Sequence, residues 1–285
     1  MEPLPREVVD WLASSGEGEL LTSKPVGGGC IHQARLLRTS AGGHFFLKSN
    51  RSVPQDMFRR EAEGLQAIKV VGGPRIPEAL LVGKDFLLLE DLQPAARRDD
   101  FWEVYGTQLA CLHQQSNHQF GFPHDNYLGS SVQHNGWLED GFDFYCQRRL
   151  VPQIQRAADQ GYLTREDRKR CDSLLARLPD LLPGGPAVLV HGDLWSGNLI
   201  TDSEGDPALI DPAAHYGWAE ADLAMTDLFG RYPEDFYQAY LAENPLPGGF
   251  RERYPLYNLY HLLNHLNIFG RQYLPGVRDV LQRYS

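Results

Sequence analysis

Several features that identify particular classes of protein are scarce or absent in this chain. It has only four cysteines in 285 residues and no CxxC pair. Neither a disulfide framework nor a cysteine-based zinc site is therefore indicated, and we expect a reducing, cytoplasmic location. Lysine and arginine (27) are outnumbered by aspartate and glutamate (37). The resulting net charge of −10 disfavours DNA or RNA as a partner.

Long hydrophobic runs, internal repeats and flexible linkers are also absent. No apolar stretch approaches the roughly 20 residues that cross a bilayer, and residues 1–15 lack the basic and apolar regions of a signal peptide. We therefore expect neither membrane insertion nor secretion. Hydrophobic content of 42% and charged content of 22% are ordinary for a globular protein. The length suits one large or two modest domains.

The most informative stretch of the sequence runs from residue 188 to residue 211. A short apolar run leads into His-Gly-Asp at 191–193, and a second apolar run ends at Asp211. Runs of this kind predict buried strands, with polar groups where the chain leaves the core. The stretch therefore predicts that Asp193, Asn198 and Asp211 lie together at the mouth of a small β-hairpin.

These three residue types at this spacing suit phosphoryl transfer. The Asp of an H-x-D sequence orients the acceptor hydroxyl or accepts its proton, and the Asn after four further residues holds Mg²⁺ together with a later Asp. We therefore predict Asp193 as the catalytic residue and Asn198 and Asp211 as metal ligands. The alternative is a set of ordinary turn residues. It leaves unexplained an unpaired carboxylate, Asp211, at the end of an apolar strand, where burial is costly.

Two charged residues earlier in the chain support a nucleotide site. Residues 54–69 have apolar side chains at helical spacing, and Glu61 lies in the middle of that apolar face. A carboxylate buried there needs a partner, and Lys48, which ends the preceding F-F-L-K strand, is the natural one. Either residue alone would be read as a surface group. The two together, ahead of Asp193, favour a phosphate-binding lysine held by a glutamate.

A glycine-rich turn precedes Lys48. Gly27, Gly28 and Gly29 separate two predicted strands, 20–26 and 31–37, and would let backbone amides approach a phosphate closely. The G-x-G-x-x-G pattern of protein kinases is absent, so this turn is atypical. Cys30 follows it directly, and an electropositive turn favours the thiolate. Cys30 is a candidate redox switch, or simply a small residue that the turn tolerates.

Longer motifs resemble one known family. H-G-D-L-W-S-G-N at 191–198, I-D-P-A at 210–213, Tyr216-Gly217, E-x-D-L-A-M at 220–225 and the C-terminal L-Y-H-L-L-N-H-L-N-I-F-G look like the fructosamine (ketosamine) kinase family. That family is a branch of the kinase-like fold, related to aminoglycoside and choline kinases. The resemblance extends through most of the chain.

The resemblance implies a fold, a reaction and a set of partners. We expect a two-lobed, protein-kinase-like α+β fold, with an ATP-binding lobe at 1–92 and a catalytic, acceptor-binding lobe at 93–285. The implied cofactors are ATP and Mg²⁺. The implied reaction phosphorylates the C3 hydroxyl of a ketosamine, the sugar adduct of an amine or protein lysine, as a deglycation repair step. Backbone groups of Glu90 and Leu92 would pair with adenine.

The resemblance also implies acceptor contacts. The segment 120–137, with Asn126, Gly129 and Gln133, would border the acceptor site. Tyr216 and Trp218 are further substrate candidates, and Trp218 departs from the family pattern. Trp195, two residues after Asp193, either covers the acceptor as an indole platform or packs under the loop.

Two alternatives to this function remain at the sequence level. A kinase for aminoglycosides or another amino-alcohol such as choline would use the same Asp193, Asn198 and Asp211. A non-catalytic nucleotide-binding scaffold is an alternative of another class, which the intact set of charged residues disfavours. The preferred sugar and amine, a free or a protein-bound substrate, and the oligomeric state are left open.

The remainder of the chain is predicted to be mainly helical. Asp99 is the expected N-cap of a helix, and further helices are expected at 142–158, 165–178 and 219–230. His261 and His265 are four residues apart on one helix, as metal ligands can be, but no HExxH glutamate accompanies them. We interpret both as packing and hydrogen-bonding residues.

Overall fold

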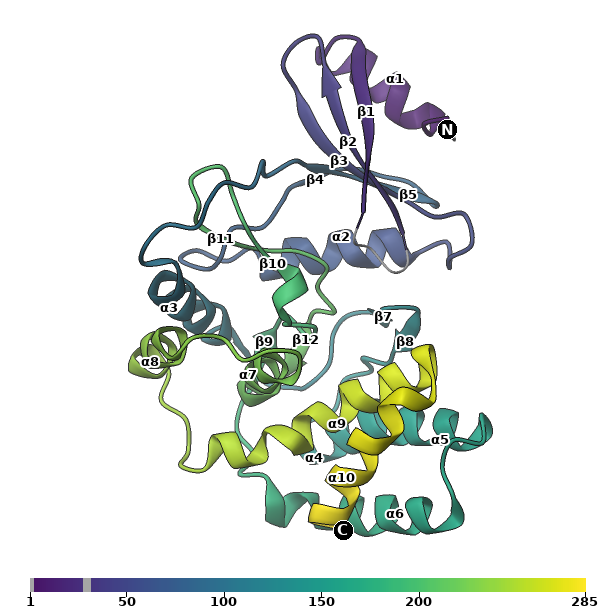
Figure 1. Cartoon of the computed structure of the whole chain (residues 1–285), viewed down its shortest axis with the longest axis vertical. Helices are drawn as coiled ribbons and strands as arrows, with labels where there is room; N and C mark the ends of the chain where they lie inside the picture. Colours follow the sequence, from purple (N-terminus) through teal and green to yellow (C-terminus); the bar gives the residue numbers. More distant parts are fainter. Residues whose placement is uncertain (1–2, 28–31) are drawn as a thin grey trace.

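The computed structural model describes residues 3–27 and 32–285 and has a small lobe above a larger one (Figure 1). The small lobe contains an antiparallel sheet in the order β1-β2-β3-β5-β4. Its strands and two helices are α1 (Arg6–Ser14), β1 (Leu20–Val26), β2 (Gln33–Thr39), β3 (His44–Ser49), α2 (Met57–Ile68), β4 (Ala79–Val82) and β5 (Phe86–Glu90). The α+β, kinase-like fold class is confirmed.

Alternation along the central strands gives the sheet two apolar faces. Phe86 and Leu88 of β5 pack with Val8 and Leu12 of α1, forming a core of their own. Leu87 and Leu89 point the other way and join the large core that includes Phe58 and Leu65 of α2, among others. Because side chains alternate with period two, β3 places Leu47 on the α1 face and Lys48 on the α2 face. Lys48 therefore faces α2.

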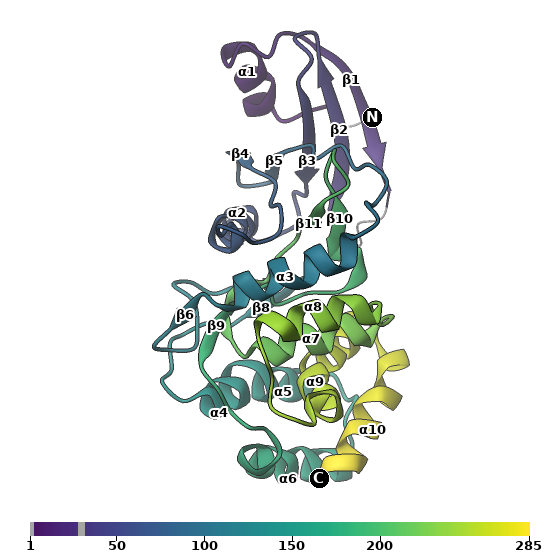
Figure 2. The ribbon, with the colours of Figure 1, turned by 90° about the vertical axis from the view of Figure 1, so that its left-hand side faces the viewer.

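The large lobe is mainly helical. Its helices are α3 (Phe101–His113), α4 (Gly141–Phe144), α5 (Val151–Asp159), α6 (Arg165–Leu181), α7 (Ala219–Leu228), α8 (Glu234–Glu243), α9 (Phe250–Phe269) and α10 (Leu274–Tyr284). In Figure 2, α3 lies between the small lobe and the other helices. None of the helices in the described ranges is long and apolar enough to cross a membrane.

Short strands carry the loops of the large lobe. They are β6 (Ser116–Asn117), β7 (Asn126–Leu128), β8 (Ser131–Gln133), β9 (Ala187–Val190), β10 (Leu199–Thr201), β11 (Pro207–Leu209) and β12 (His215–Gly217). Strand β9 pairs with β12 and β6, β10 pairs with β11, and β7 pairs with β8. The predicted hairpin around the polar residues is thus β10–β11, with β9 leading into it.

Two local predictions differ in detail from the structure. The first helix of the large lobe begins at Phe101 with Asp100, not Asp99, at its N-cap, and no side chain caps it. The helix expected at 142–158 is divided by a π-helical turn, Tyr145–Leu150. Pro152 at the start of α5 explains the division, because it has no N–H to donate to the preceding turn.

Segment 120–137, predicted to border the acceptor site, keeps that role as a prediction. It contains the β7–β8 hairpin, which turns at Gly129 with a φ of 61°. The side chains of Asn126 and Gln133 are buried and bond to the carbonyl oxygens of Ala214 (2.8 Å) and Ala213 (3.0 Å). These two side chains support the segment after Asp211.

Candidate active site

The loop that carries Asp193 is held by a buried carboxylate of α7. Asp222 accepts hydrogen bonds from the backbone N–H groups of His191 (2.6 Å) and Gly192 (2.8 Å). Burial opposes its ionisation, but the hydrogen bond from His113, the nearby histidines and the Gly192 N–H together lower the pKa of Asp222. The backbone entering the catalytic loop is thereby fixed by charge-assisted bonds. Sequence reasoning assigned Asp222 no role, although an Asp inside the apolar A-D-L-A-M run was a usable signal.

Asp193 lies half-buried at the end of this loop. The amide nitrogen of Asn198 donates to its carboxylate (3.1 Å) and to its backbone carbonyl (2.9 Å). Burial raises the pKa of Asp193 to about 7, the Asp211 carboxylate adds to the rise, and the Asn198 hydrogen bond opposes it. A carboxyl group with this pKa exchanges a proton readily near neutral pH, as a general base requires.

His191 supports the loop and is not placed for proton transfer. Its Nε2 lies 2.9 Å from the carbonyl oxygen of Ile210, and its Nδ1 accepts from the Asp193 N–H (3.2 Å). Burial lowers the pKa of His191, so the ring is neutral at physiological pH. Both ring nitrogens are occupied by backbone groups, which ties the catalytic loop to the strand that leads to Asp211.

Lys48 joins the two lobes through a pair of carboxylates. Its Nζ donates to Glu61 of α2 (2.7 Å), as predicted, and also forms a very short contact with Asp211. Burial works against the ammonium group, but the charges of Asp211 and Glu61 outweigh it and raise the pKa of Lys48. The predicted Lys48–Glu61 ion pair is confirmed, and Lys48 lies directly beside a predicted metal ligand.

Asn198 and Asp211 have the chemistry of a Mg²⁺ site. Asn198 uses its amide nitrogen toward Asp193 and keeps its amide oxygen for a cation. Asp211 has a φ of 57°, uncommon for a residue with a side chain and often associated with function. Within residues 3–27 and 32–285 no cluster of three His, Cys, Asp or Glu could hold a metal. A two-ligand site completed by water and phosphate suits Mg²⁺, and the residues therefore fit it.

The nucleotide side of the site is only partly described. Gly27 lies at the end of β1, where an added Cβ would meet open space. Gly28, Gly29 and Cys30 lie outside the described residues, so their predicted roles remain predictions. His32, which sequence reasoning missed, lies against Phe58 of α2, with the ring centroids 4.9 Å apart and the rings tilted by 45°. Burial and the charge of Lys48 lower the pKa of His32 to about 4, which places a neutral imidazole beside Lys48.

The predicted adenine contacts are backbone groups of Glu90 and Leu92. The N–H of Glu90 donates to the carbonyl of Glu78 (2.9 Å), and its carboxylate pairs with Arg75. This N–H is occupied inside the small lobe, and pairing of the other backbone groups of Glu90 with adenine stays a prediction. Leu92 is buried two residues further on, and its N–H donates to no group among the described residues. Leu92 keeps its predicted role as a proposal.

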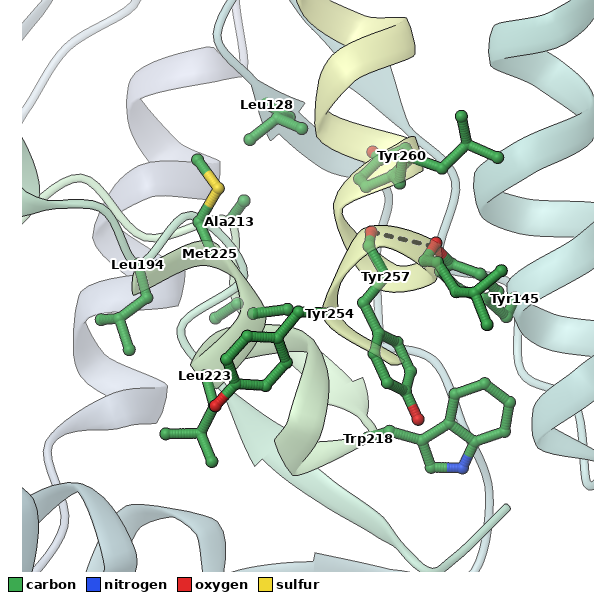
Figure 3. Packing of buried hydrophobic residues seen from close by; sticks show 14 of the residues in the cluster. Leu128, Tyr145, Leu194, Ala213, Trp218, Leu223, Met225, Tyr254, Tyr257 and Tyr260 are labelled. Atoms are coloured by element: carbon green, nitrogen blue, oxygen red, sulfur yellow. Dashed lines mark hydrogen bonds between the residues drawn. The ribbon is translucent and has the colours of Figure 1, made fainter. Parts of the chain in front are cut away.

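Trp195, two residues after Asp193, is exposed. Its indole is 38% exposed, while Leu194 before it is fully buried (Figure 3). One side of the indole lies over Gly197, where any Cβ would clash with the ring. Phe229 meets it edge-on at 6.2 Å, and His265 lies 5.1 Å from Phe229. Phe229 thus connects the rings of Trp195 and His265 in one aromatic row.

The other two substrate candidates lie elsewhere. Trp218 is 6% exposed and packs among Phe120, Phe142, Tyr145 and Tyr257 in the core (Figure 3). Predicting it as a substrate contact was wrong, because its ring is enclosed by other aromatic rings. Tyr216 is partly exposed in β12 and lies beside Trp137 at 6.1 Å. Its backbone pairs with Gly121 (Tyr216 N–H to Gly121 carbonyl, 2.8 Å), and its role at the acceptor stays a prediction.

Solved structures define the class of protein. The crystal structure of a Thermobifida fusca protein assigned as a fructosamine-3-kinase matches over 98% of both chains, with a TM-score of 0.89 and 30% identity. An ADP-bound aminoglycoside phosphotransferase shares the fold at 16% identity, with a TM-score of 0.64 over 98% of this chain and 97% of that one. Fold and site together define a kinase-like phosphotransferase that uses ATP and acts on a hydroxyl group.

Sequence relatives then give the family. The sequence profile of the fructosamine kinase family matches residues 8–285. A Synechocystis sp. protein named as a probable ketoamine kinase is 37% identical over 265 residues, covering 91% of this chain and 89% of its own. A chloroplastic protein-ribulosamine 3-kinase of Arabidopsis thaliana is 35% identical over 285 residues, covering 96% and 86%. This chain belongs to the fructosamine kinase family, as the motifs predicted.

Proposed function

We propose that this enzyme transfers the γ-phosphoryl group of ATP to the C3 hydroxyl of a ketosamine. Relatives that cover most of the chain are named as kinases of ketoamines and of protein ribulosamines. One structural observation carries the proposal. The exposed indole of Trp195 stands two residues from Asp193, so an apolar platform lies next to the group that would receive the hydroxyl proton.

The residues of the site have distinct roles in this proposal. Asp193 orients the acceptor hydroxyl and takes its proton, which its pKa of about 7 permits. Lys48 steadies the α- and β-phosphates, and Glu61 keeps Lys48 in place. Asn198 and Asp211 would hold Mg²⁺, which, when bound, offsets negative charge on the phosphates. The catalytic contribution of the chain is therefore positioning and charge neutralisation.

We infer that ATP binds between a small lobe of about residues 1–92 and a large lobe of 93–285. The chain leaves the sheet after Glu90, and the β10–β11 turn reaches up to this connection. Ala95 N–H donates to the carbonyl of Asp202 (3.0 Å), and Arg98 pairs with Asp206 (2.6 Å). These contacts fix the connection between the lobes against the hairpin that carries the metal ligands.

The aromatic row of Trp195, Phe229 and His265 suits the acceptor. A ketose ring presents an apolar C–H face that can lie on an indole, and its adduct carries a protonated secondary amine. A cation over an aromatic face gains roughly 0.5–2 kcal/mol, depending on desolvation. The row thus offers a surface for the sugar next to Asp193 and for the amine further out.

The experiment is an ATP-consumption assay with a panel of acceptors. We expect turnover with fructosyl- and ribulosyl-lysine analogues and little with kanamycin or choline. A ketosamine lacking the C3 hydroxyl should bind and not turn over. Ready phosphorylation of kanamycin or choline, without turnover of either ketosamine, would leave only a small-molecule kinase of another specificity.

A further inference from the structure

Helix α2 belongs to the small lobe by sequence but is attached to the large lobe at three points along its length. At its N-terminus, the hydroxyl of Tyr127 in β7 donates to Asp56 (2.7 Å). In its middle, Glu61 reaches Asp211 through Lys48. In its second half, Gly64 packs against Pro212 and Ala214. Figure 1 shows α2 beneath the sheet, with β7 below one end of the helix.

The close contact at Gly64 favours a glycine. A Cβ at this position would lie 3.2 Å from Cγ of Pro212 and 3.7 Å from Cβ of Ala214. The helix therefore approaches the segment after Asp211 more closely than any other residue type would allow without displacement. The segment that follows Asp211 and the helix that holds Lys48 are therefore closely packed.

The β7–β8 hairpin holds both of these features. Asn126, adjacent to Tyr127, donates to the carbonyl of Ala214 (2.8 Å), and Gln133 donates to the carbonyl of Ala213 (3.0 Å) and to Asn126 (2.8 Å). Asn135 adds a further bond to Asn126 (2.9 Å). The amide network is buried and internally bonded, which makes the hairpin a rigid support.

The hydrogen bond between Tyr127 and Asp56 connects this rigid hairpin to the N-terminus of α2. The hydrogen bond from Tyr127 is the main reason that the pKa of Asp56 is lowered, and Arg60, one turn along α2, also bonds to Asp56 (3.1 Å). Burial and the bond to Asp56 raise the pKa of Tyr127 to about 12, so the phenol keeps its proton. A protonated donor and an ionised acceptor make a strong, directed bond.

We propose that the β7–β8 hairpin clamps α2 to the metal-binding segment, and that Tyr127 is a positioning residue for nucleotide binding. One side of the hairpin holds Asp56 and the other holds the carbonyls after Asp211. The two carboxylates that flank Lys48 therefore keep a fixed separation. Without the clamp, α2 can move with the sheet, and Lys48 loses its defined place between Glu61 and Asp211. This inference depends on the proposed role of Lys48 in binding phosphate.

The test is the substitution Tyr127→Phe, which removes one oxygen atom. We expect the KM for ATP to rise about fivefold and the affinity for ADP, measured by calorimetry without acceptor, to fall by a similar factor. The KM for a ketosamine and kcat should change less than twofold, because Asp193 and Trp195 are held by other contacts. Amide protons of α2 should exchange faster with solvent.

Tyr284→Phe is the matched control, since Tyr284 also donates through its hydroxyl, to the carbonyl of Glu252 (2.6 Å), at an exposed position of α10. Asp56→Ala provides a second variant, and the double variant should be no worse than the more impaired single one. Unchanged nucleotide affinity in Tyr127→Phe, or an equal change in Tyr284→Phe, would overturn the proposal.

Lys48→Met separates this inference from the proposed function. We expect it to abolish detectable ADP binding. If Lys48→Met instead bound nucleotide normally, the assignment of Lys48 to phosphate would be wrong. The proposed effect of the clamp on nucleotide binding would then have no basis. If Lys48→Met fails to bind and Tyr127→Phe binds normally, only the clamp is wrong.

Discussion

The loop of Asp193 and the segment after Asp211 are held in place by different kinds of hydrogen-bonding group. In the loop of Asp193, backbone N–H groups donate to the buried carboxylate of Asp222. In the segment after Asp211, backbone carbonyls accept from the buried amides of Asn126 and Gln133. One loop depends on a charge and the other on neutral groups.

This difference matches the different requirements of the two loops. The catalytic loop must hold one carboxylate at a fixed position while the surroundings raise its pKa, so a second, charged group fixes its backbone. The metal segment must present Asp211 toward Lys48, and its neutral supports add no further charge beside a cation site. Substitutions in the two loops should therefore differ in kind and in size.

The largest effect should separate the two aspartates themselves. Asp193→Asn should lower kcat about 10²- to 10⁴-fold, because proton handling is lost while nucleotide contacts remain. Asp211→Asn should weaken Mg²⁺-ATP binding together with the rate. Steady-state kinetics and equilibrium binding of Mg²⁺-ADP distinguish the two results. Equal Mg²⁺-nucleotide affinity in both variants would mean that the two roles are wrongly assigned.

Substitutions of the residues that support the two loops should have the next largest effects. Asp222→Asn should destabilise the protein by ~3 kcal/mol or more, because a bond between a backbone N–H and a carboxylate is replaced by an unfavourable contact between donors in a buried site. Gln133→Leu should cost about 1–3 kcal/mol, since only neutral bonds are lost. Urea denaturation gives both values.

Asp227→Asn, on the same helix as Asp222, serves as the control for this comparison. Asp227 is exposed and pairs with Arg231 only at 3.9 Å, so its loss should cost ~0.5 kcal/mol or less. A smaller loss of stability for Asp222→Asn than for Gln133→Leu would contradict the proposed division between charged and neutral support.

Each loop is followed by a tryptophan, and the two should respond differently. Trp195→Leu should raise the KM for a fructosamine about tenfold, equivalent to about 1.4 kcal/mol, with Tm and ATP affinity nearly unchanged. Trp218→Leu should destabilise the protein by about 2–4 kcal/mol, because it opens space in the aromatic core. A fall in Tm with every kinetic constant impaired in Trp195→Leu would show that its indole is a packing residue after all.

Smaller effects should appear in the pH dependence of stability. Burial and the positive charge of Arg149 lower the pKa of His215, behind the metal segment, to about 3. Below pH 6.5 this histidine binds a proton in the unfolded chain but not in the folded chain. Stability therefore falls as pH drops from about 6.5 toward 3. The slope is at most ~1.4 kcal/mol per pH unit for this group. His215→Gln should reduce that slope in urea titrations at pH 7 and pH 5.

Titration of Asp193 should change the stability with pH in the opposite direction. Its pKa in the folded state, about 7, is raised above the unfolded value. The stability it contributes is therefore present below about pH 4 and is lost as pH rises through 7. Asp193→Asn should be more stable than the wild type at pH 8, on the order of 1 kcal/mol for this half-buried group, with no gain at pH 4. An equal gain at both pH values would show that titration of Asp193 is not the cause.

Much of the fold and part of the site could be predicted from the sequence. Residues 20–26 and 187–190 form the predicted strands β1 and β9, because short apolar or alternating runs between turns have few other solutions. The Lys48–Glu61 pair could be predicted because a carboxylate in the middle of an apolar helix face needs a partner. Motifs were enough to identify the family that the profile and relatives show.

Other features could not be read from the order of residues. Trp195 and Trp218 are equally apolar in sequence, and only the fold determines that one is exposed and the other enclosed by four rings. The supports of the catalytic and metal-binding loops, Asp222, Asn126 and Gln133, lie far from the aspartates along the chain. Spacing carries no information about such pairings, because they arise when separate elements pack together.

The sequence alone determined the reaction chemistry of this protein, since the types and spacing of Asp193, Asn198 and Asp211 already specify groups suited to phosphoryl transfer. It also determined which face of β3 carries Lys48, through the period-two alternation of a strand. The tertiary structure alone decided which groups hold these residues still and which aromatic ring stays open to an acceptor. The physical reason is that burial and hydrogen-bond partners are properties of the packed chain and not of any single segment.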